Sequence, residues 1–307
     1  MRRFFLLGPT ASGKSAVAVP LARLLGAEIL TLDSMQVYRG MDVGTAKPGP
    51  EERGGVAHHL LDLADPREEY SVARWLEAAD AVEADLRARG IHALYAGGTG
   101  MYLKARVSGL VETPPPPEDL RRRLRERLEA GEREALRAEL ERLDPALHAR
   151  LHPGDDQRLL RGLEVVLSTG RPLSSWQEEW EPGEPLGEPA VALAWEREVL
   201  RRRVEERFDR MLEEGLVEEV QALRAAGGPG PTARKALGYR QILDWLEGRI
   251  SREEARRRAI QGTRTLIRRQ MTWLRSFPDL RWLPVGESDD PEDLARKARD
   301  LLREARG

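Results

Sequence analysis

The residues best suited to chemistry stand near the start of the chain, where G-P-T-A-S-G-K-S occupies residues 8–15. The stretch fits the phosphate-binding template G-x-x-x-x-G-K-[ST] at every fixed position. Glycines let backbone N–H groups curl around phosphate oxygens, and the helix that follows adds its positive dipole end. Lys14 would neutralise terminal phosphate charge, and the Ser15 hydroxyl would bind Mg²⁺. Most such loops hold a nucleoside triphosphate such as ATP, but the template itself specifies only a diphosphate unit and a metal.

The acid that should accompany this loop is not where a motor or switch NTPase would have it. Such proteins place an Asp at the end of another buried strand to organise metal and water. The candidate strand within I-H-A-L-Y-A-G-G-T-G (91–100) ends in glycines and Thr99 instead. The nearest acid after a strand is Asp33, 19 residues beyond Lys14, and the carboxyl ends of strands form the ligand crevice of open α/β sheets. We therefore expect group transfer to an acceptor that faces Asp33; the alternative is that Asp33 only caps the following turn.

Short apolar segments alternate with helical patterns in a way that indicates β-α units around a mostly parallel sheet. The fold class expected is α/β, a phosphate-loop-type sheet flanked by helices, with an all-helical insertion. From residue 198 onward the chain is expected to form long Arg/Glu-rich helices, broken at G-G-P-G-P (227–231). The expected strands are Phe4–Leu7, Ile29–Leu32, His59–Leu63, Ile91–Ala96 and Ala190–Trp195, and the clearest early helices are Ala16–Leu25 and Val72–Arg89.

Two proline-rich breakers bracket the expected insertion. They are T-P-P-P-P at 113–117 and E-P-G-E-P-L-G-E-P at 181–189, and proline at this density continues neither a helix nor a central strand. Between them the chain is highly charged, with leucines at helical spacing. The predicted domains are a catalytic core of residues 1–112 and 190–307 and a helical insertion of residues 113–189.

Composition describes a chain of 307 residues with a net charge of −2 and no cysteine. The absence of cysteine excludes a disulfide framework, thiolate catalysis and a cysteine-based zinc site. No apolar run approaches the roughly 20 residues of a membrane span, so we expect a cytoplasmic protein. His58 and His59 have no third ligand at suitable spacing, and we interpret them as structural.

Several stretches together resemble one family. They are G-P-T-A-S-G-K-S, D-S-M-Q-V-Y, M-D-V-G-T-A-K-P, H-H-L-L-D, A-G-G-T-G-M-Y, D-D-Q-R-L-L-R-G-L-E-V, A-L-G-Y-R-Q and R-R-Q-M-T-W-L-R. From residue 4 to about 276 the chain resembles the bacterial tRNA dimethylallyltransferases, also called tRNA isopentenyltransferases. The resemblance implies that the loop holds dimethylallyl diphosphate, with Mg²⁺ as cofactor. The five-carbon group would go to N6 of the adenine immediately 3′ of the anticodon of a tRNA, and diphosphate would be released. We expect the protein to be a monomer.

The resemblance also implies roles for individual residues. Asp33 would accept the N6 proton, Arg207 would stabilise the leaving diphosphate, and Thr99 would lie near the target nucleotide. The diphosphate would contact Gly8, Thr10, Ala11, Ser12, Gly13, Lys14 and Ser15. The insertion would contact the anticodon stem-loop, and the tRNA would be bound by Asp33, Ser34, Met35, Gln36, Thr99, Arg121, Gln157, Arg158, Leu159, Leu160, Arg161, Arg234, Lys235 and Gly238; Arg264 and Arg268 are added to the tRNA-binding residues on other grounds, given next.

An arginine stripe points to RNA independently of that family. In the helix expected over Ser251–Arg275, four arginines spaced by 7, 4 and 7 share one face: Arg257, Arg264, Arg268 and Arg275. An adjacent apolar stripe would seat the helix on the core: Ile260, Ile267, Met271 and Leu274. Few glutamates interleave after Glu254, which favours a phosphate-binding face over a solvated surface.

Two other functions remain open from the residues alone. A small-molecule or nucleoside kinase using ATP would explain the loop and Asp33, but it leaves the arginine stripe and the insertion unexplained. An RNA-binding module with a vestigial loop would explain the stripe, but the intact Lys14 and Ser15 argue against decay.

Overall fold

The computed structural model describes residues 1–109, 113–177 and 183–304. These residues form two compact units, one of Met1–Gly109 with Gly183–Gly307 and the other of Leu110–Pro182. Each unit has its own hydrophobic core. The part of the second proline-rich breaker at 181–182 lies outside the described residues.

The first unit is built on six strands that all run parallel, in the order β3-β2-β4-β1-β5-β6. The interior strand β1 has β4 on one side and β5 on the other, with Phe5 in register with Tyr95 and Ala190. The predicted α/β class with a parallel sheet is confirmed. The strands are β1 (Arg3–Leu7), β2 (Ala27–Leu32), β3 (His58–His59), β4 (His92–Gly97), β5 (Ala190–Trp195) and β6 (Arg281–Val285).

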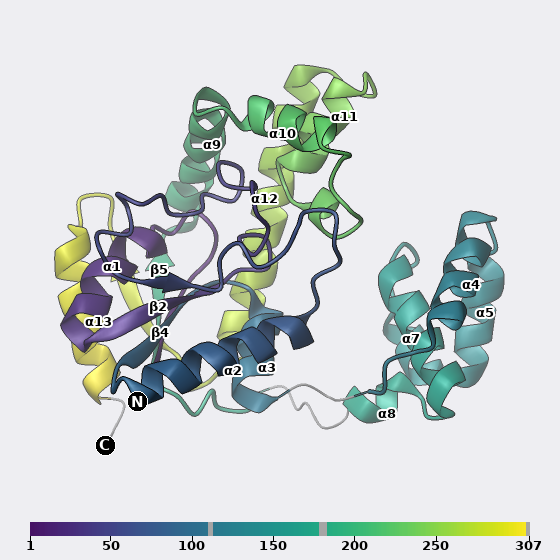
Figure 1. Cartoon of the computed structure of the whole chain (residues 1–307), viewed down its shortest axis with the longest axis horizontal. Helices are drawn as coiled ribbons and strands as arrows, with labels where there is room; N and C mark the ends of the chain where they lie inside the picture. Colours follow the sequence, from purple (N-terminus) through teal and green to yellow (C-terminus); the bar gives the residue numbers. More distant parts are fainter. Residues whose placement is uncertain (110–112, 178–182, 305–307) are drawn as a thin grey trace. The chain divides into compact units, whose positions relative to one another are not determined.

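Helices cover both faces of this sheet because successive side chains of each strand point to opposite sides. Phe4 and Leu6 of β1 pack beneath α1 and α13, which lie side by side in Figure 1, while Phe5 and Leu7 face the other layer. The helices of this unit are α1 (Lys14–Leu25), α2 (Val72–Ala88), α3 (Gly100–Ser108), α9 (Arg197–Glu213), α10 (Leu216–Ala225), the 3₁₀ turn η1 (Ala233–Lys235), α11 (Tyr239–Leu246), α12 (Arg252–Arg275) and α13 (Pro291–Glu304).

Two strands differ from the sequence-based expectation. The third strand is only His58–His59, because Leu60 and Asp62 adopt positive φ angles of 66° and 57° that end the extended run expected to reach Leu63. The expectation of helices alone after residue 198 is wrong, since Arg281–Val285 forms β6 at the sheet edge. A proline has no backbone N–H to donate to the hydrogen bonds of a sheet. Pro284 would therefore disrupt a central strand but is tolerated at the edge.

The second unit is a small helical bundle. Its leucine core includes Leu124, Leu136, Leu140 and Leu163. Asp144 is fully buried and ties two helices together, since its carboxylate accepts from Leu147 N at 3.0 Å and from Ser174 N at 2.9 Å. The helices are α4 (Glu118–Glu129), α5 (Arg133–Leu143), α6 (Pro145–Arg150), α7 (Asp156–Thr169) and α8 (Leu173–Gln177).

Candidate functional site

The phosphate-binding template forms the turn between β1 and α1, at the carboxyl edge of the sheet. Gly13 has a φ angle of 79°, which a residue with a side chain rarely adopts, and α1 starts at Lys14 directly after it. The helix therefore directs its unpaired N–H groups and positive dipole end towards the turn. This local geometry is the one that anion binding requires.

Lys14 folds back over the loop. Its Nζ donates to Pro9 O at 2.7 Å and to Ser12 Oγ at 3.4 Å. Burial, together with the nearby positive charge of Arg207, lowers the pKa of Lys14 to about 7, against a weaker opposing effect of Asp33. The three side chains therefore lie close enough for their charges to interact.

Arg207, near the middle of α9, is the second cation beside the loop. Burial lowers its pKa, an effect that the Asp33 carboxylate opposes. Arginine nevertheless stays charged at neutral pH. Within the described residues no hydrogen bond or ion pair engages its guanidinium. The Lys14 amine and the Arg207 guanidinium thus lie close together at the loop, an arrangement that a bound anion would stabilise in its protonated form.

Asp33 follows β2, and its two carboxylate oxygens have different surroundings. Its Oδ1 accepts from Met35 N at 2.8 Å and from Gln36 N at 3.4 Å, so the carboxylate does cap the following turn. No residue of the described ranges donates to Oδ2. Capping and a chemical role therefore do not compete for the same oxygen.

Thr99 joins this site from the neighbouring strand. It precedes α3, and its Oγ1 accepts from Ser34 N at 3.3 Å. Gly98 packs so tightly that an added Cβ would lie 2.6 Å from Gly8 O. The glycines of A-G-G-T-G therefore let the end of β4 approach the phosphate loop.

The segment around Gln36 is braced from the C-terminal half of the chain. Gln36 Nε2 donates to Thr45 O and Ala46 O at 3.1 Å each. The carboxylate of Glu219 in α10 accepts from the backbone N–H groups of residues 42, 43 and 44 and from the Tyr239 hydroxyl. Gln36, predicted to contact tRNA, therefore has its amide N–H groups occupied inside the loop.

Three residues that the sequence did not single out hold the phosphate loop. Gln270 Oε1 in α12 accepts from Thr10 N at 2.8 Å. Trp195 Nε1 donates to Ser12 O at 2.8 Å, and Arg203 Nε donates to Ala11 O at 2.9 Å. No motif marks them; only the tertiary structure brings them to the loop.

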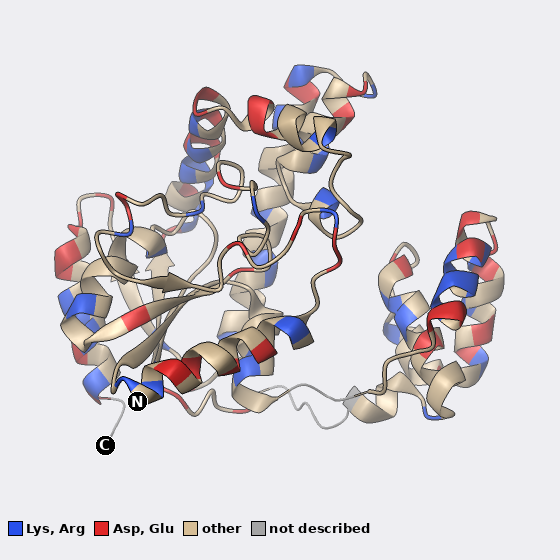
Figure 2. Cartoon of the chain, viewed as in Figure 1, with Lys and Arg blue, Asp and Glu red and all other residues tan. Residues whose placement is uncertain are grey.

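The arginines of the α12 stripe differ in the partners that they bond. The apolar side is seated as expected, with Ile260 and Leu274 buried. Arg257 pairs with Glu254 of its own helix, and Arg264 pairs with Glu205 of α9. Arg268 is exposed, and among the described residues its guanidinium bonds Thr265 Oγ1 alone, at 3.0 Å. Figure 2 shows acidic and basic residues alternating along α9, the helix that supplies Glu205.

The residues predicted to bind tRNA in the helical unit lie on α4 and α7. Arg121 and Arg161 both approach Glu164, at 3.7 Å and 3.4 Å. Gln157 and Arg158 are exposed near the start of α7, whereas the Leu159 side chain is 1% exposed in the core and Leu160 packs against that core. Any contact from Leu159 to RNA would therefore involve its backbone.

The remaining predicted residues cluster around η1 and the start of α11. Arg234 pairs with Glu247 at 3.3 Å. Lys235 ends η1, and Gly238 N donates to Gln241 Oε1 at 2.9 Å at the start of α11.

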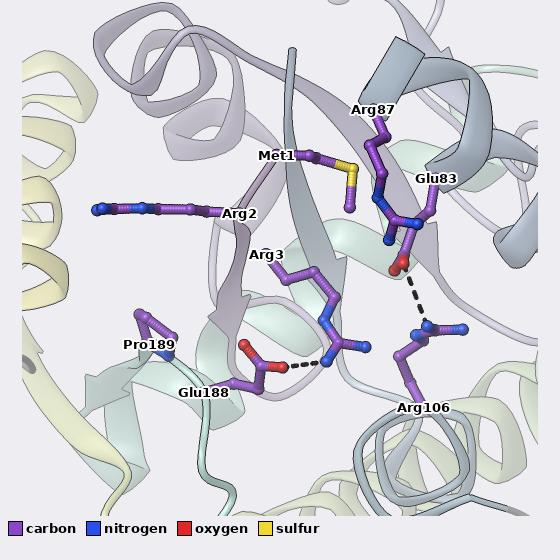
Figure 3. A pocket seen from close by; sticks show the side chains of 8 residues that line it. All are labelled: Met1, Arg2, Arg3, Glu83, Arg87, Arg106, Glu188 and Pro189. Carbon is purple, nitrogen blue, oxygen red and sulfur yellow. Dashed lines mark hydrogen bonds and ion pairs between the residues drawn. The ribbon is translucent and has the colours of Figure 1, made fainter. Parts of the chain in front are cut away.

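The cavity in Figure 3 lies at the opposite end of β1 from the phosphate loop. It has a volume of about 580 Å³ and is lined by residues that include Arg3, Arg106 and Glu188. Ion pairs join Arg3 to Glu188 and Arg106 to Glu83 across it. None of the predicted site residues lines this cavity.

No group of three or more His, Asp or Glu side chains in the described ranges could hold a metal ion alone. His58 and His59 bond Val56 O at 2.9 Å and Glu28 Oε2 at 2.7 Å, which accounts for both rings. Ser15 is exposed at the start of α1. A hydroxyl at this position fits Mg²⁺ that is held mostly by substrate phosphates and water. Among the described helices, none has the length and apolar character to cross a membrane.

A parallel sheet with this loop after an interior strand, and an acid ending another strand, defines a phosphate-loop protein of the group-transfer class. The profile of the IPP transferase family matches residues 36–277, and that of isopentenyl transferases matches residues 1–65. The chain belongs to the IPP transferase family.

Individual relatives cover almost the whole chain. A tRNA dimethylallyltransferase of Geobacter metallireducens is 46% identical over 92% of each chain, and one of Methylococcus capsulatus is 46% identical over 97% of this chain and 96% of its own. The solved tRNA isopentenylpyrophosphate transferase of Bacillus halodurans superimposes with a TM-score of 0.71 at 32% identity, covering 99% of this chain and 97% of its own. A eukaryotic dimethylallyltransferase acting on tRNA gives a TM-score of 0.76 at 26% identity, covering 94% and 75%.

Proposed function

We propose that this protein transfers the dimethylallyl group of dimethylallyl diphosphate to tRNA, at N6 of the adenine immediately 3′ of the anticodon, with release of diphosphate. Its family, and relatives named for this activity over nearly their full length, support the reaction. Binding of the donor is supported by one observation: two basic side chains, Lys14 and Arg207, lie together at the phosphate loop with Asp33 beside them.

The donor would be bound through its diphosphate. The loop residues from Gly8 to Ser15, with Thr10, Ala11, Ser12 and Gly13 between, would surround the phosphate oxygens through backbone N–H groups. Lys14 and Arg207 would offset the charge that grows as the leaving group departs. Ser15 would bind Mg²⁺, which would neutralise further diphosphate charge.

The acceptor would lie between Asp33 and Thr99. The N6 lone pair attacks C1 of the dimethylallyl group, the C1–O bond breaks with its electrons going to diphosphate, and the N6 proton passes to a base. Asp33 Oδ2 is suited to accept that proton, because Oδ1 alone maintains the turn. To reach this site the adenine must leave the stack of neighbouring bases, and this costs little free energy in a single-stranded loop.

Contacts to the tRNA would come from both units. We propose that the helical unit of Leu110–Pro182 binds the anticodon stem-loop. The residues proposed to contact tRNA are Asp33, Ser34, Met35, Gln36, Thr99, Arg121, Gln157, Arg158, Leu159, Leu160, Arg161, Arg234, Lys235, Gly238, Arg264 and Arg268. We further propose that the protein works as a monomer in the cytoplasm, where tRNA is processed.

Diphosphate binding should be linked to proton uptake by Lys14. With a pKa of about 7 in the free protein, Lys14 is largely neutral at higher pH, whereas a bound diphosphate would hold it protonated. Affinity should therefore fall as pH rises from 7 to 9, approaching about tenfold per unit for one proton. Calorimetry in buffers with different ionisation heats measures this uptake. In Lys14→Met it should be absent, and an affinity of the parent that is constant over this range would contradict the linkage.

Arg264 and Arg268 should contribute to the salt dependence of tRNA binding. If each contacts a phosphate, changing it to Gln should weaken binding and lower the slope of log K against log salt by roughly 0.7–0.9. Arg296→Gln on α13, which lies on the opposite face of the sheet, serves as the matched control and should leave the slope unchanged. A parental slope in both α12 variants would make this helix face an ordinary solvated surface.

The reaction itself is tested with labelled dimethylallyl diphosphate, Mg²⁺ and unmodified tRNA, followed by nucleoside analysis. The proposed function requires label on N6 of the adenine next to the anticodon and diphosphate release that depends on both substrates. Turnover of ATP with a small acceptor and no RNA would instead indicate a kinase. Binding of tRNA without any transfer would indicate an RNA-binding module.

A further inference from the structure

Two side chains from outside the phosphate-loop motif hold consecutive carbonyl groups of the loop. Trp195, the last residue of β5, donates from Nε1 to Ser12 O at 2.8 Å. Arg203, two turns into α9, donates from Nε to Ala11 O at 2.9 Å. The Arg203 guanidinium also stacks on the Trp195 ring, 4.4 Å from its centre, so the two side chains fix each other.

Fixing a carbonyl also fixes the amide that shares its peptide plane. In a trans peptide the C=O and the next N–H point in opposite directions, and the described chain has no cis peptide bond. Holding Ala11 O and Ser12 O from one side therefore directs the N–H groups of Ser12 and Gly13 towards the other. Ser12 N donates to Pro9 O at 3.3 Å within the loop, whereas no residue of the described ranges accepts from Gly13 N. An amide aimed in this way and left without an acceptor is a group that would bind a phosphate oxygen.

The same helix also supplies the cation beside Lys14. Arg203 and Arg207 are four residues apart, so both project from one face of α9. Arg203 contacts the loop carbonyl of Ala11, whereas Arg207 lies near Lys14 and Asp33. A shift of α9 would therefore alter the loop amides and the cation pair together.

We propose that Arg203 and Trp195 are positioning residues that set the loop at residues 12 and 13, and with it the Gly13 amide, for the diphosphate before it binds. This inference rests on the proposed function, since it assumes a diphosphate in the loop. Neither residue touches the substrate in this role; each acts through a backbone carbonyl. Preset donors need no rearrangement when the anion arrives, and this lowers the cost of binding.

The test uses variants that remove one hydrogen bond while keeping the packing. Trp195→Phe keeps a stacked ring and loses the Nε1 donor. Arg203→Lys keeps the charge and loses the planar group that both stacks and donates from Nε. Arg201→Gln is the matched control, because Arg201 lies on the same helix and pairs with Glu198 and with no other acid of the described residues. Binding of Mg²⁺ with inorganic diphosphate, the KM for each substrate and the thermal midpoint are measured for every protein.

The expected loss of diphosphate affinity is roughly three- to tenfold for Trp195→Phe and about ten- to a hundredfold for Arg203→Lys, from the usual worth of neutral and charged hydrogen bonds. The KM for dimethylallyl diphosphate should rise in parallel while the KM for tRNA and the thermal midpoint stay near the parent's. Arg201→Gln should match the parent throughout.

Three outcomes would overturn the inference. Parental diphosphate affinity in both variants would show that the carbonyl bonds do not set the loop. Full affinity in Arg203→Lys, with loss only in a further variant, Arg203→Gln, that removes the charge, would show that Arg203 touches the diphosphate through its charge. Equal losses for tRNA and diphosphate with a lowered midpoint would show a general structural role. If the parent itself does not bind diphosphate, the proposed function fails and this inference with it.

Discussion

Replacing Asp33 by Asn should slow single-turnover transfer by about 10²–10⁴-fold, the usual contribution of a positioned general base. The exocyclic amine of adenine is a weak nucleophile because its lone pair is delocalised into the ring. A carboxylate that takes the N6 proton during attack offsets this weakness, and an amide cannot. Rapid-quench measurement at saturating tRNA and dimethylallyl diphosphate gives the rate of the chemical step.

The structure indicates that this substitution should remove the base without disturbing the turn that Asp33 caps. Asn retains an oxygen that can accept from Met35 N and Gln36 N, so the turn after β2 should persist. Diphosphate affinity and the thermal midpoint should therefore remain close to those of the parent, while tRNA affinity changes modestly. Asp33→Ala, which also loses the turn, separates the two roles. A near-parental rate in Asp33→Asn would mean that Asp33 orients or caps and that another group accepts the proton.

Replacing Arg207 by Gln should lower the transfer rate by about 10²–10³-fold, the range measured when one preset donor to a developing charge is removed. Negative charge grows on the diphosphate as the C1–O bond breaks, so the contact should strengthen in the transition state. A half-buried site amplifies that effect because water screens it less. The measurement is again the single-turnover rate at saturating donor, together with the donor KM.

Arg210→Gln provides the control for Arg207. It removes an exposed positive charge from the same helix, three residues further on. Its rate should stay within a few-fold of the parent's because Arg210 affects the site only through its field. A rise in KM with an unchanged rate in Arg207→Gln would mean that Arg207 binds substrate and transition state equally.

Features encoded in short stretches of sequence were predictable. The phosphate-loop template, the alternation of strands with helices and the bounds of β5 follow from local spacing and breakers, and the structure has them. The strand β6 was not predictable in this way, since R-W-L-P-V contains a proline and sits between helical patterns. It forms because it can pair with β5 at the edge of the sheet, and that edge exists only once the sheet has folded.

The environment of the site residues was equally beyond a local pattern. Arg264 was predicted to lie on a phosphate-binding face because few glutamates follow Glu254 in its own helix. Its partner Glu205 comes from α9, which only folding brings near. Arg203 is one arginine among several in R-R-R-V-E-E-R, and nothing in that run marks it for contact with Ala11 O. Pairing of surface charges depends on which helices meet, and spacing within one helix does not report that.

The fastening of the phosphate loop has a consequence for how the protein is made. The loop leaves the ribosome well before its partners, which follow after 183, 192 and 260 residues, at Trp195, Arg203 and Gln270. Contacts between such distant residues form late. The long intervening chain must first be closed into a loop, at a cost in entropy, before those contacts can stabilise the fold. A nascent chain that carries the whole motif therefore still lacks the groups that shape it. Competence to hold diphosphate is acquired only after Gln270 has been translated, long after the motif that encodes it.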